Sequence, residues 1–246
     1  MELEHTVERI LPDAPKTREE YLLFLRHLFA YESVISYIEQ DSEILEVGFG
    51  EGYGSRMLSE KAAKVTGVEV EEDTVHYANE KYGSPSCSFV HYNGEQLPFD
   101  DEQFDYAVSF QVIEHIEDVP PFLREIRRVL KVDRQCFITT PNRIHRLEPG
   151  EEPWNEFHIR EYAPQDLEEE LANVFTRVEI KGVRGRGAVQ DIELRRVSRN
   201  LSLYKLLPDF AKRLLHRGFE DLYTTNDFML VNTAEEGLDL FAICTK

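Results

Sequence analysis

The chain has few cysteines and no long apolar run. Its 246 residues include three cysteines, Cys87, Cys136 and Cys244, which form no C-x-x-C pair and lie in apolar, strand-like runs. This pattern predicts reduced core thiols in a cytoplasmic protein. No apolar run approaches the roughly 20 residues that span a bilayer. The acidic N-terminus MELEHTVERI lacks the basic and apolar regions of a signal peptide.

Positive charge is also scarce. The net charge of −19 argues against a general nucleic-acid binder, because such binding needs Lys and Arg to displace counterions. Residues 181–217 are the exception, with ten Lys or Arg against Asp191, Glu193 and Asp209. A solvated face is the simplest interpretation of this segment. The functional hypothesis is that it recognises an anionic acceptor, such as a phosphorylated glycan, or meets an acidic partner.

The stretch EILEVGFGEGYGSR, residues 43–56, joins a short apolar run to four glycines at alternate positions. Residues 44–47 predict a buried strand, and the segment after Gly54 predicts a helix. Glycines in such a loop let a ligand approach the main chain closely, and the helix N-terminus favours an electron-rich ligand. The dinucleotide fingerprint G-x-G-x-x-G would need glycine where Tyr53 stands, which disfavours a Rossmann oxidoreductase.

An acidic residue near the end of the next expected strand, residues 64–70, is a second signal. Glu69 follows Gly50 by about the 20 residues expected of an acid that binds ribose hydroxyls. An ordinary turn and a solvated strand end are the alternatives for each feature alone. Together, E-x-G-x-G-x-G from Glu46 and the acid Glu69 resemble motifs I and II of class I S-adenosylmethionine (SAM) dependent methyltransferases.

The resemblance continues downstream and covers about residues 43–142. NGEQLPF, residues 93–99, is similar to the family's D-A-E-x-L-P-F stretch, where the loop holds the adenine, with Asn93 in place of the commoner Asp. The resemblance implies SAM as the cofactor. It implies that the cofactor-binding residues are Glu46, Gly48, Gly50, Gly52, Glu69, Val70, Asn93, Gly94, Glu95, Phe110 and Gln111.

The alternation of expected strands and helices predicts an α/β fold, as in this family. We expect a Rossmann-like, seven-stranded, mostly parallel sheet with an antiparallel last strand, preceded by N-terminal helices. Thr17 and Glu20 predict a capping box at the start of the first helix. The long connection before the last strand contains the amphipathic segment 201–219 and predicts a cap or a subunit contact, as in a homo-oligomer. The expected units are a helical lead (1–42), the SAM-binding core (43–183), a basic helical insertion (184–236) and the last core strand (237–246).

Two histidines are the candidate catalytic residues. A hydroxyl acceptor needs its proton removed before it attacks the methyl group, and neutral imidazole titrates in the useful range. His115 follows the expected fourth strand, and His158 lies in FHIREYAPQDLEEEL. Capping a helix and supporting a loop are the structural alternatives. The latter stretch resembles a segment of small-molecule and glycan methyltransferases, which implies such an acceptor, with O-methylation first and N-methylation second.

A metal ion is the other interpretation of the same residues. The string VIEHI resembles that of quinone and small-RNA methyltransferases, in which E-x-x-E-H and a later His bind a divalent cation. Here Gln111 stands at the first Glu position, which leaves Glu114, His115 and His158. The loss of one anionic ligand weakens a site for a hard cation, so we expect no metal. A SAM-binding subunit without catalysis is the non-enzyme alternative.

Overall fold

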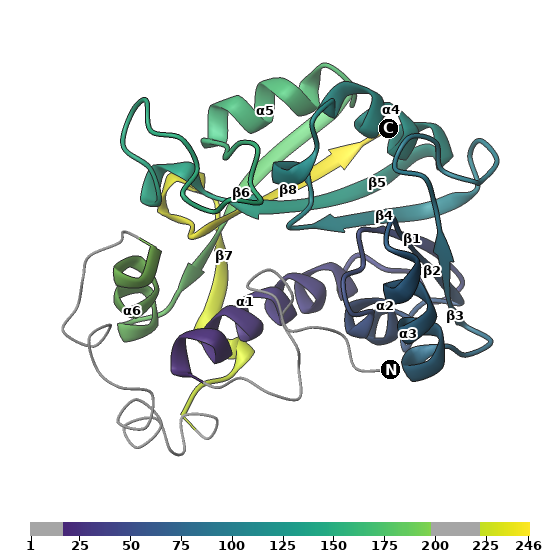
Figure 1. Ribbon diagram of the computed structural model, residues 1–246, viewed down its shortest axis with the longest axis horizontal. Helices are drawn as coiled ribbons and strands as arrows, with labels where there is room; N and C mark the ends of the chain where they lie inside the picture. Colours follow the sequence, from purple (N-terminus) through teal and green to yellow (C-terminus); the bar gives the residue numbers. More distant parts are fainter. Residues whose placement is uncertain (1–16, 198–221) are drawn as a thin grey trace.

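An eight-stranded sheet runs through the computed structural model, which describes residues 17–197 and 222–246 (Figure 1). The strand order is β3-β2-β1-β4-β5-β8-β6-β7. The strands are β1 (Glu43–Val47), β2 (Lys64–Glu69), β3 (Cys87–His91), β4 (Phe104–Phe110), β5 (Leu130–Pro141), β6 (Arg177–Gly185), β7 (Phe228–Val231) and β8 (Asp239–Thr245).

Strand direction confirms the predicted Rossmann-like fold. The strands from β3 to β5 pair in parallel, whereas β8 runs antiparallel to both β5 and β6. Strands β2 and β3 extend the sheet from one side of β1, and β4 and β5 extend it from the other side. The strand order therefore reverses between the neighbouring strands β1 and β4. Open α/β sheets bind ligands at such a switch point, beyond the carboxyl ends of the strands.

The sheet has one strand more than the seven predicted. Strand β7 pairs antiparallel with β6 and lies within 184–236, which the sequence assigns to a helical insertion. Its four residues form a short apolar run, and periodicity does not distinguish such a run from a piece of buried helix. Helix α6 (Ala188–Val197) lies in the same stretch of the chain. The amphipathic segment 201–219 lies outside the described residues.

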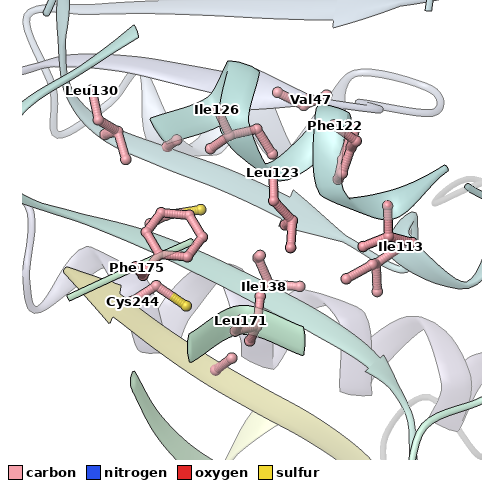
Figure 2. Close-up of a cluster of buried hydrophobic side chains, with 14 of the residues drawn as sticks. Val47, Ile113, Phe122, Leu123, Ile126, Leu130, Ile138, Leu171, Phe175 and Cys244 are labelled. Carbon is pink, nitrogen blue, oxygen red and sulfur yellow. The ribbon is translucent and has the colours of Figure 1, made fainter. Parts of the chain in front are cut away.

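Helices cover both faces of the sheet (Figure 1). On one face, α4 and α5 bury apolar side chains against the strands, as Figure 2 shows for Leu123, Ile126 and Leu171. On the other face, α1, α2 and α6 pack around residues such as Leu22, Leu58 and Val189. The remaining helices have these bounds: α1 (Arg18–Ile35), α2 (Tyr53–Leu58), α3 (Glu72–Tyr82), α4 (Val119–Val129) and α5 (Pro164–Ala172).

Local signals in the sequence explain several element ends. Oγ1 of Thr17 accepts a hydrogen bond from the backbone N of Glu20 (3.1 Å), so the predicted N-cap of α1 is confirmed. Helix α1 runs without a break from Arg18 to Ile35. Proline in the first turn begins both α4 and α5. The three cysteines are buried and unpaired, as predicted, and burial raises the pKa of each thiol.

Candidate active site

The glycine loop joins β1 to α2 at the carboxyl end of β1. Gly48, Gly50 and Gly52 all have positive φ. A Cβ on Gly48 would lie 2.5 Å from the Val112 side chain, so close chain packing excludes a larger residue there. A Cβ on Gly50 would meet nothing within 4 Å. The positive φ of Gly50, +59°, and the open space beside it are what a loop needs to admit a ligand.

Glu46 is fully buried near the end of β1, two residues before Gly48. Its Oε1 accepts a 2.6 Å hydrogen bond from the hydroxyl of Tyr31 on α1, and its Oε2 accepts one from Ser55 on α2. Burial raises the pKa of Glu46 to about 7, and the two donors partly oppose this shift. The carboxyl group of Glu46 therefore links α1 and α2 to the strand that leads into the glycine loop.

Glu69 ends β2, beside the same loop. Its Oε2 accepts a 3.4 Å hydrogen bond from the backbone N of Gly50, and its Oε1 accepts one from the N of Val70 (2.8 Å). The two sequence motifs, about 20 residues apart, thus meet at one edge of the sheet. Val70 is half exposed and packs near Gly94, where an added Cβ would lie 3.4 Å from a Val70 methyl.

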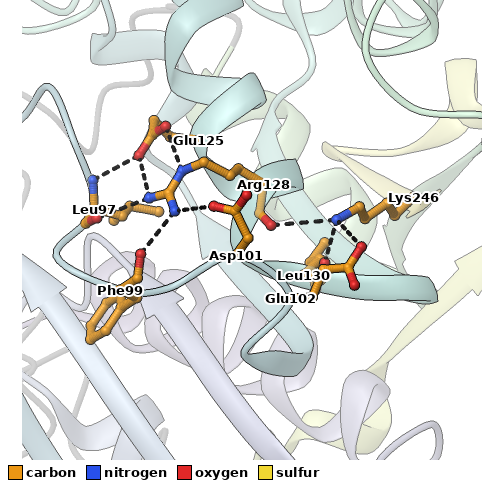
Figure 3. Close-up of polar contacts among 8 residues, drawn as sticks. All are labelled: Leu97, Phe99, Asp101, Glu102, Glu125, Arg128, Leu130 and Lys246. Atoms are coloured by element: carbon orange, nitrogen blue, oxygen red, sulfur yellow. Dashed lines mark hydrogen bonds and ion pairs between the residues drawn. The ribbon is translucent and has the colours of Figure 1, made fainter.

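The loop after β3 is held by its own hydrogen bonds and by α4. Oδ1 of Asn93 accepts from the backbone N of Glu95 (3.0 Å) and of Gln96 (3.1 Å). The side-chain carbonyl of Asn93, which the resemblance assigns to the adenine, is thus already engaged. Arg128 donates to the carbonyls of Leu97 and Phe99, which fixes the far end of the loop (Figure 3).

Two residues at the end of β4 face different surroundings. The ring of Phe110 packs against that of Tyr31 on the α1 side of the sheet, with 4.9 Å between the ring centroids. Gln111 has φ +57°, unusual for a residue with a side chain. Its Nε2 donates to Oγ1 of Thr139 (3.1 Å). A backbone in this region is costly and is found at functional sites.

Gln111 lines a cavity of about 110 Å³. Three of its arginines are already paired with carboxylates: Arg26 with Glu193 and Asp239, Arg196 with Glu193, and Arg146 with Glu161. The cavity is lined by Leu23, Arg26, His27, Gln111, Glu114, His115, Pro141, Arg146, Trp154, Asn155, His158 and Arg196.

His115 and His158 meet at this cavity. Their ring centroids lie 5.0 Å apart, edge to face. Nδ1 of His115 lies 2.8 Å from the carbonyl oxygen of Phe157, and Nδ1 of His158 lies 2.9 Å from Oε1 of Glu161. The sequence predicts each histidine separately, and the fold brings them together.

A comparison with known proteins decides the family. A Mycobacterium tuberculosis protein named a probable SAM-dependent methyltransferase is 30% identical over 256 residues, which cover 98% of this chain and 89% of the relative. The chain belongs to the SAM-dependent methyltransferases. A family model described as a methyltransferase domain matches residues 45–138 of this methyltransferase.

Further relatives agree with this assignment. A Mycolicibacterium smegmatis protein of the same name is 36% identical over 175 residues, 71% of this chain, and the match spans 65% of the relative. Among solved structures, a SAM-dependent methyltransferase of Thermotoga maritima matches with a TM-score of 0.60 and 18% identity over 93% of this chain and 94% of that one. At this identity the likeness shows the fold. In the described part of the methyltransferase, no helix has the length and apolarity to span a bilayer.

SAM is the cofactor of this methyltransferase. The site fits it, because a Cβ would fill the open space at Gly50 and because the Glu69 carboxylate lies beside that space. We expect the Gly48–Gly52 loop and Glu69 to hold the cofactor, which supplies an electrophilic methyl group when bound.

Sequence reasoning missed the residues that support this site. Tyr31 and Ser55 orient Glu46, but neither belongs to the E-x-G-x-G-x-G motif. Glu51, in the loop, is bound by Lys81 (2.6 Å) and Tyr77 (2.8 Å) of α3. The sequence does contain a signal for Glu161 as a partner of His158, because Glu161 follows His158 by three residues in FHIREY.

Proposed function

We propose that this methyltransferase transfers the SAM methyl group to a hydroxyl group of a small molecule or glycan. The observation that supports this most is the position of Gln111. Gln111 directly follows β4, which pairs with β1, the strand that leads into the glycine loop, and it lines the cavity that contains both histidines. A cofactor at the loop and an acceptor in the cavity would therefore meet beside Gln111.

The transfer is an in-line displacement in which the acceptor oxygen attacks the methyl carbon and the C–S bond breaks. S-adenosylhomocysteine leaves, and the hydroxyl proton must go to a base. Because a carbonyl or carboxylate oxygen only accepts, Nδ1 of His115 and of His158 carries the proton in the neutral ring. Nε2 then carries the lone pair, and either imidazole suits the role of base.

The acceptor that this cavity favours is polar. Its arginines are balanced by buried carboxylates, so it offers fixed donors and acceptors without a large excess of positive charge. An anionic acceptor would use the basic segment 181–217 instead. Arg184 of that segment pairs with Glu236 at 2.6 Å, so Arg186 and Arg195 are the better test positions. Charge reversal at these two should raise the KM of an anionic acceptor and leave SAM affinity unchanged.

The test is production of S-adenosylhomocysteine from SAM with pools of hydroxylated and amine acceptors. We expect turnover with a hydroxylated pool, and methyl-labelled SAM with NMR should place the label in a methoxy group. His115→Gln and His158→Gln should lower kcat by about 10²-fold or more without changing the affinity for S-adenosylhomocysteine. Label on nitrogen would contradict O-methylation. Tight SAM binding without turnover in any pool would favour a non-catalytic SAM-binding subunit, the alternative function.

A homo-oligomer and a cytoplasmic location stay predictions from the sequence. Mass measurement in solution tests the first. Cell fractionation tests the second.

A further inference from the structure

Three side chains with metal-ligating atoms converge on the acceptor cavity. One ligand atom from each of Glu114, His115 and His158 lies within 4.8 Å of the other two. Glu114 and His115 belong to the short helix Ile113–His115 after β4, whereas His158 belongs to the segment before α5. The fold therefore brings together residues that are more than 40 positions apart in sequence. All three line the cavity.

Each imidazole is oriented by an oxygen behind it. Nδ1 of His115 donates to the Phe157 carbonyl, and Nδ1 of His158 donates to the Glu161 carboxylate. Glu161 is fixed in turn by Arg146, whose Nε lies 2.9 Å from each carboxylate oxygen. Metal-binding histidines usually donate their other ring N–H to a carbonyl or carboxylate, which fixes the tautomer and the ring. Both histidines have this arrangement.

Glu114 adds an independent observation. Its side chain is 1% exposed, and Oε2 accepts a 3.0 Å hydrogen bond from Thr140. Its other oxygen, Oε1, is buried and has no hydrogen-bond partner in the described part of the chain. A buried carboxylate oxygen without a donor is rare, because its lost hydration is not replaced. A cation between Glu114 and the two histidines would replace it.

We propose that Glu114, His115 and His158 bind one divalent transition-metal ion at the acceptor cavity. Two imidazoles and one carboxylate favour ions such as Zn²⁺ or Mn²⁺ over Mg²⁺ and Ca²⁺, which prefer all-oxygen sites. Ligand atoms around such an ion lie about 3.4 Å apart in a tetrahedral site with bonds near 2.1 Å. Binding therefore draws the three side chains closer than their present separation of up to 4.8 Å.

This proposal opposes the sequence-based expectation of no metal. That expectation rests on Gln111, which stands where a carboxylate ligand would be. In the structure Gln111 donates to Thr139. The donor set instead consists of one buried carboxylate and two oriented imidazoles.

The consequence for catalysis rests on the proposed methyl transfer to a hydroxyl. Three protein ligands leave at least one position for the acceptor oxygen. Coordination would lower the pKa of the acceptor hydroxyl, so that it would lose its proton to solvent near neutral pH. The resulting oxyanion would attack the methyl carbon as the C–S bond breaks. The histidines then act as ligands, and the ion replaces a direct base.

Metal titration of the chelator-stripped full chain tests the site without needing activity. We expect calorimetry to show one equivalent of Zn²⁺ or Mn²⁺ bound at micromolar or lower Kd, with Mg²⁺ at least 10-fold weaker. Co²⁺ should give a visible absorption spectrum characteristic of mixed nitrogen and oxygen ligands. His158→Gln and Glu114→Gln should each weaken binding by at least 10-fold. The matched control is His76→Gln, because His76 is an exposed histidine on α3 that should not affect the ion.

Circular dichroism on the same samples shows that each variant is folded, and a variant that fails to fold is replaced by His115→Gln. Binding that survives in the folded cluster variants, or that falls equally in His76→Gln, would overturn the site. So would the absence of a stoichiometric Zn²⁺ or Mn²⁺ ion. Turnover of SAM in the stripped protein, measured in parallel, would then leave the proposed methyl transfer standing without a metal.

Discussion

The hydroxyl of Tyr31 donates a 2.6 Å hydrogen bond to Oε1 of Glu46, so α1 is fastened to the strand that feeds the glycine loop. Tyr31→Phe removes this donor and leaves a buried carboxylate oxygen one partner short. We expect the free energy of unfolding to fall by about 1–3 kcal/mol, measured by urea unfolding. Tyr37→Phe is the control, since the Tyr37 ring packs 5.1 Å from Phe137 away from this bond. Equal stability of Tyr31→Phe and wild type would contradict the role of the bond.

The pKa of Glu46, raised by burial from 4.5 to about 7, makes stability depend on pH. Between these values the folded protein binds more protons than the unfolded chain, so stability falls as pH rises. The contribution of Glu46 is fully present below about pH 4.5 and is lost as pH rises through 7. Subtracting the unfolding free energy of Glu46→Gln from that of wild type isolates it, because Glu114, whose pKa is also about 7, is common to both. A difference that stays constant between pH 5 and 8 would show that Glu46 is ionised normally.

Gly50→Ala should impair cofactor binding more than folding. An added Cβ meets no protein atom but enters the open space beside Glu69, and the φ of +59° costs about 1 kcal/mol for a residue with a side chain. We expect the Kd of SAM to rise more than 10-fold, measured by calorimetry. Gly187→Ala is a matched control, since Gly187 also has positive φ, +50°, and open space around it. The account fails here if both variants bind SAM as wild type does.

Arg26 connects α1 to α6 and β8 through buried ion pairs, at 2.9 Å to Glu193 and 2.7 Å to Asp239. Arg26→Met leaves Asp239 buried without this partner, and we expect a loss of about 3–5 kcal/mol in unfolding free energy. Asp239→Asn in the same chain should restore part of it. Arg56→Met, at an exposed position, should change stability little. A small effect of Arg26→Met would mean that α6 is not held to the core by these pairs.

The glycine loop and its position beside Glu69 can be predicted from sequence because their signals are local. Glycine spacing, the strand before it and the acid Glu69 each reflect a backbone requirement within a few residues, and the structure places Glu69 beside Gly50. Fold class follows from the same alternation of strands and helices. The short strand β7 escaped because pairing with β6, and not its own four residues, determines its form.

The cavity around the two histidines depends on contacts between distant segments. The sequence indicates His115 and His158 by separate motifs, and nothing in it states that their ring centroids lie 5.0 Å apart. Burial of Glu114 and the salt bridges of Arg26 likewise depend on how helices pack on the sheet. These contacts follow from tertiary packing, so local sequence patterns do not predict them.

Calorimetric titration with S-adenosylhomocysteine tests the central claim, that the Gly50 loop and Glu69 form the cofactor site. Wild type should bind one equivalent, and Glu69→Ala should bind at least 10-fold more weakly. Glu72→Ala, an exposed change three residues away at the start of α3, should bind as wild type does. Equal affinity of Glu69→Ala and wild type would contradict the assignment of this site and, with it, the placement of the acceptor cavity.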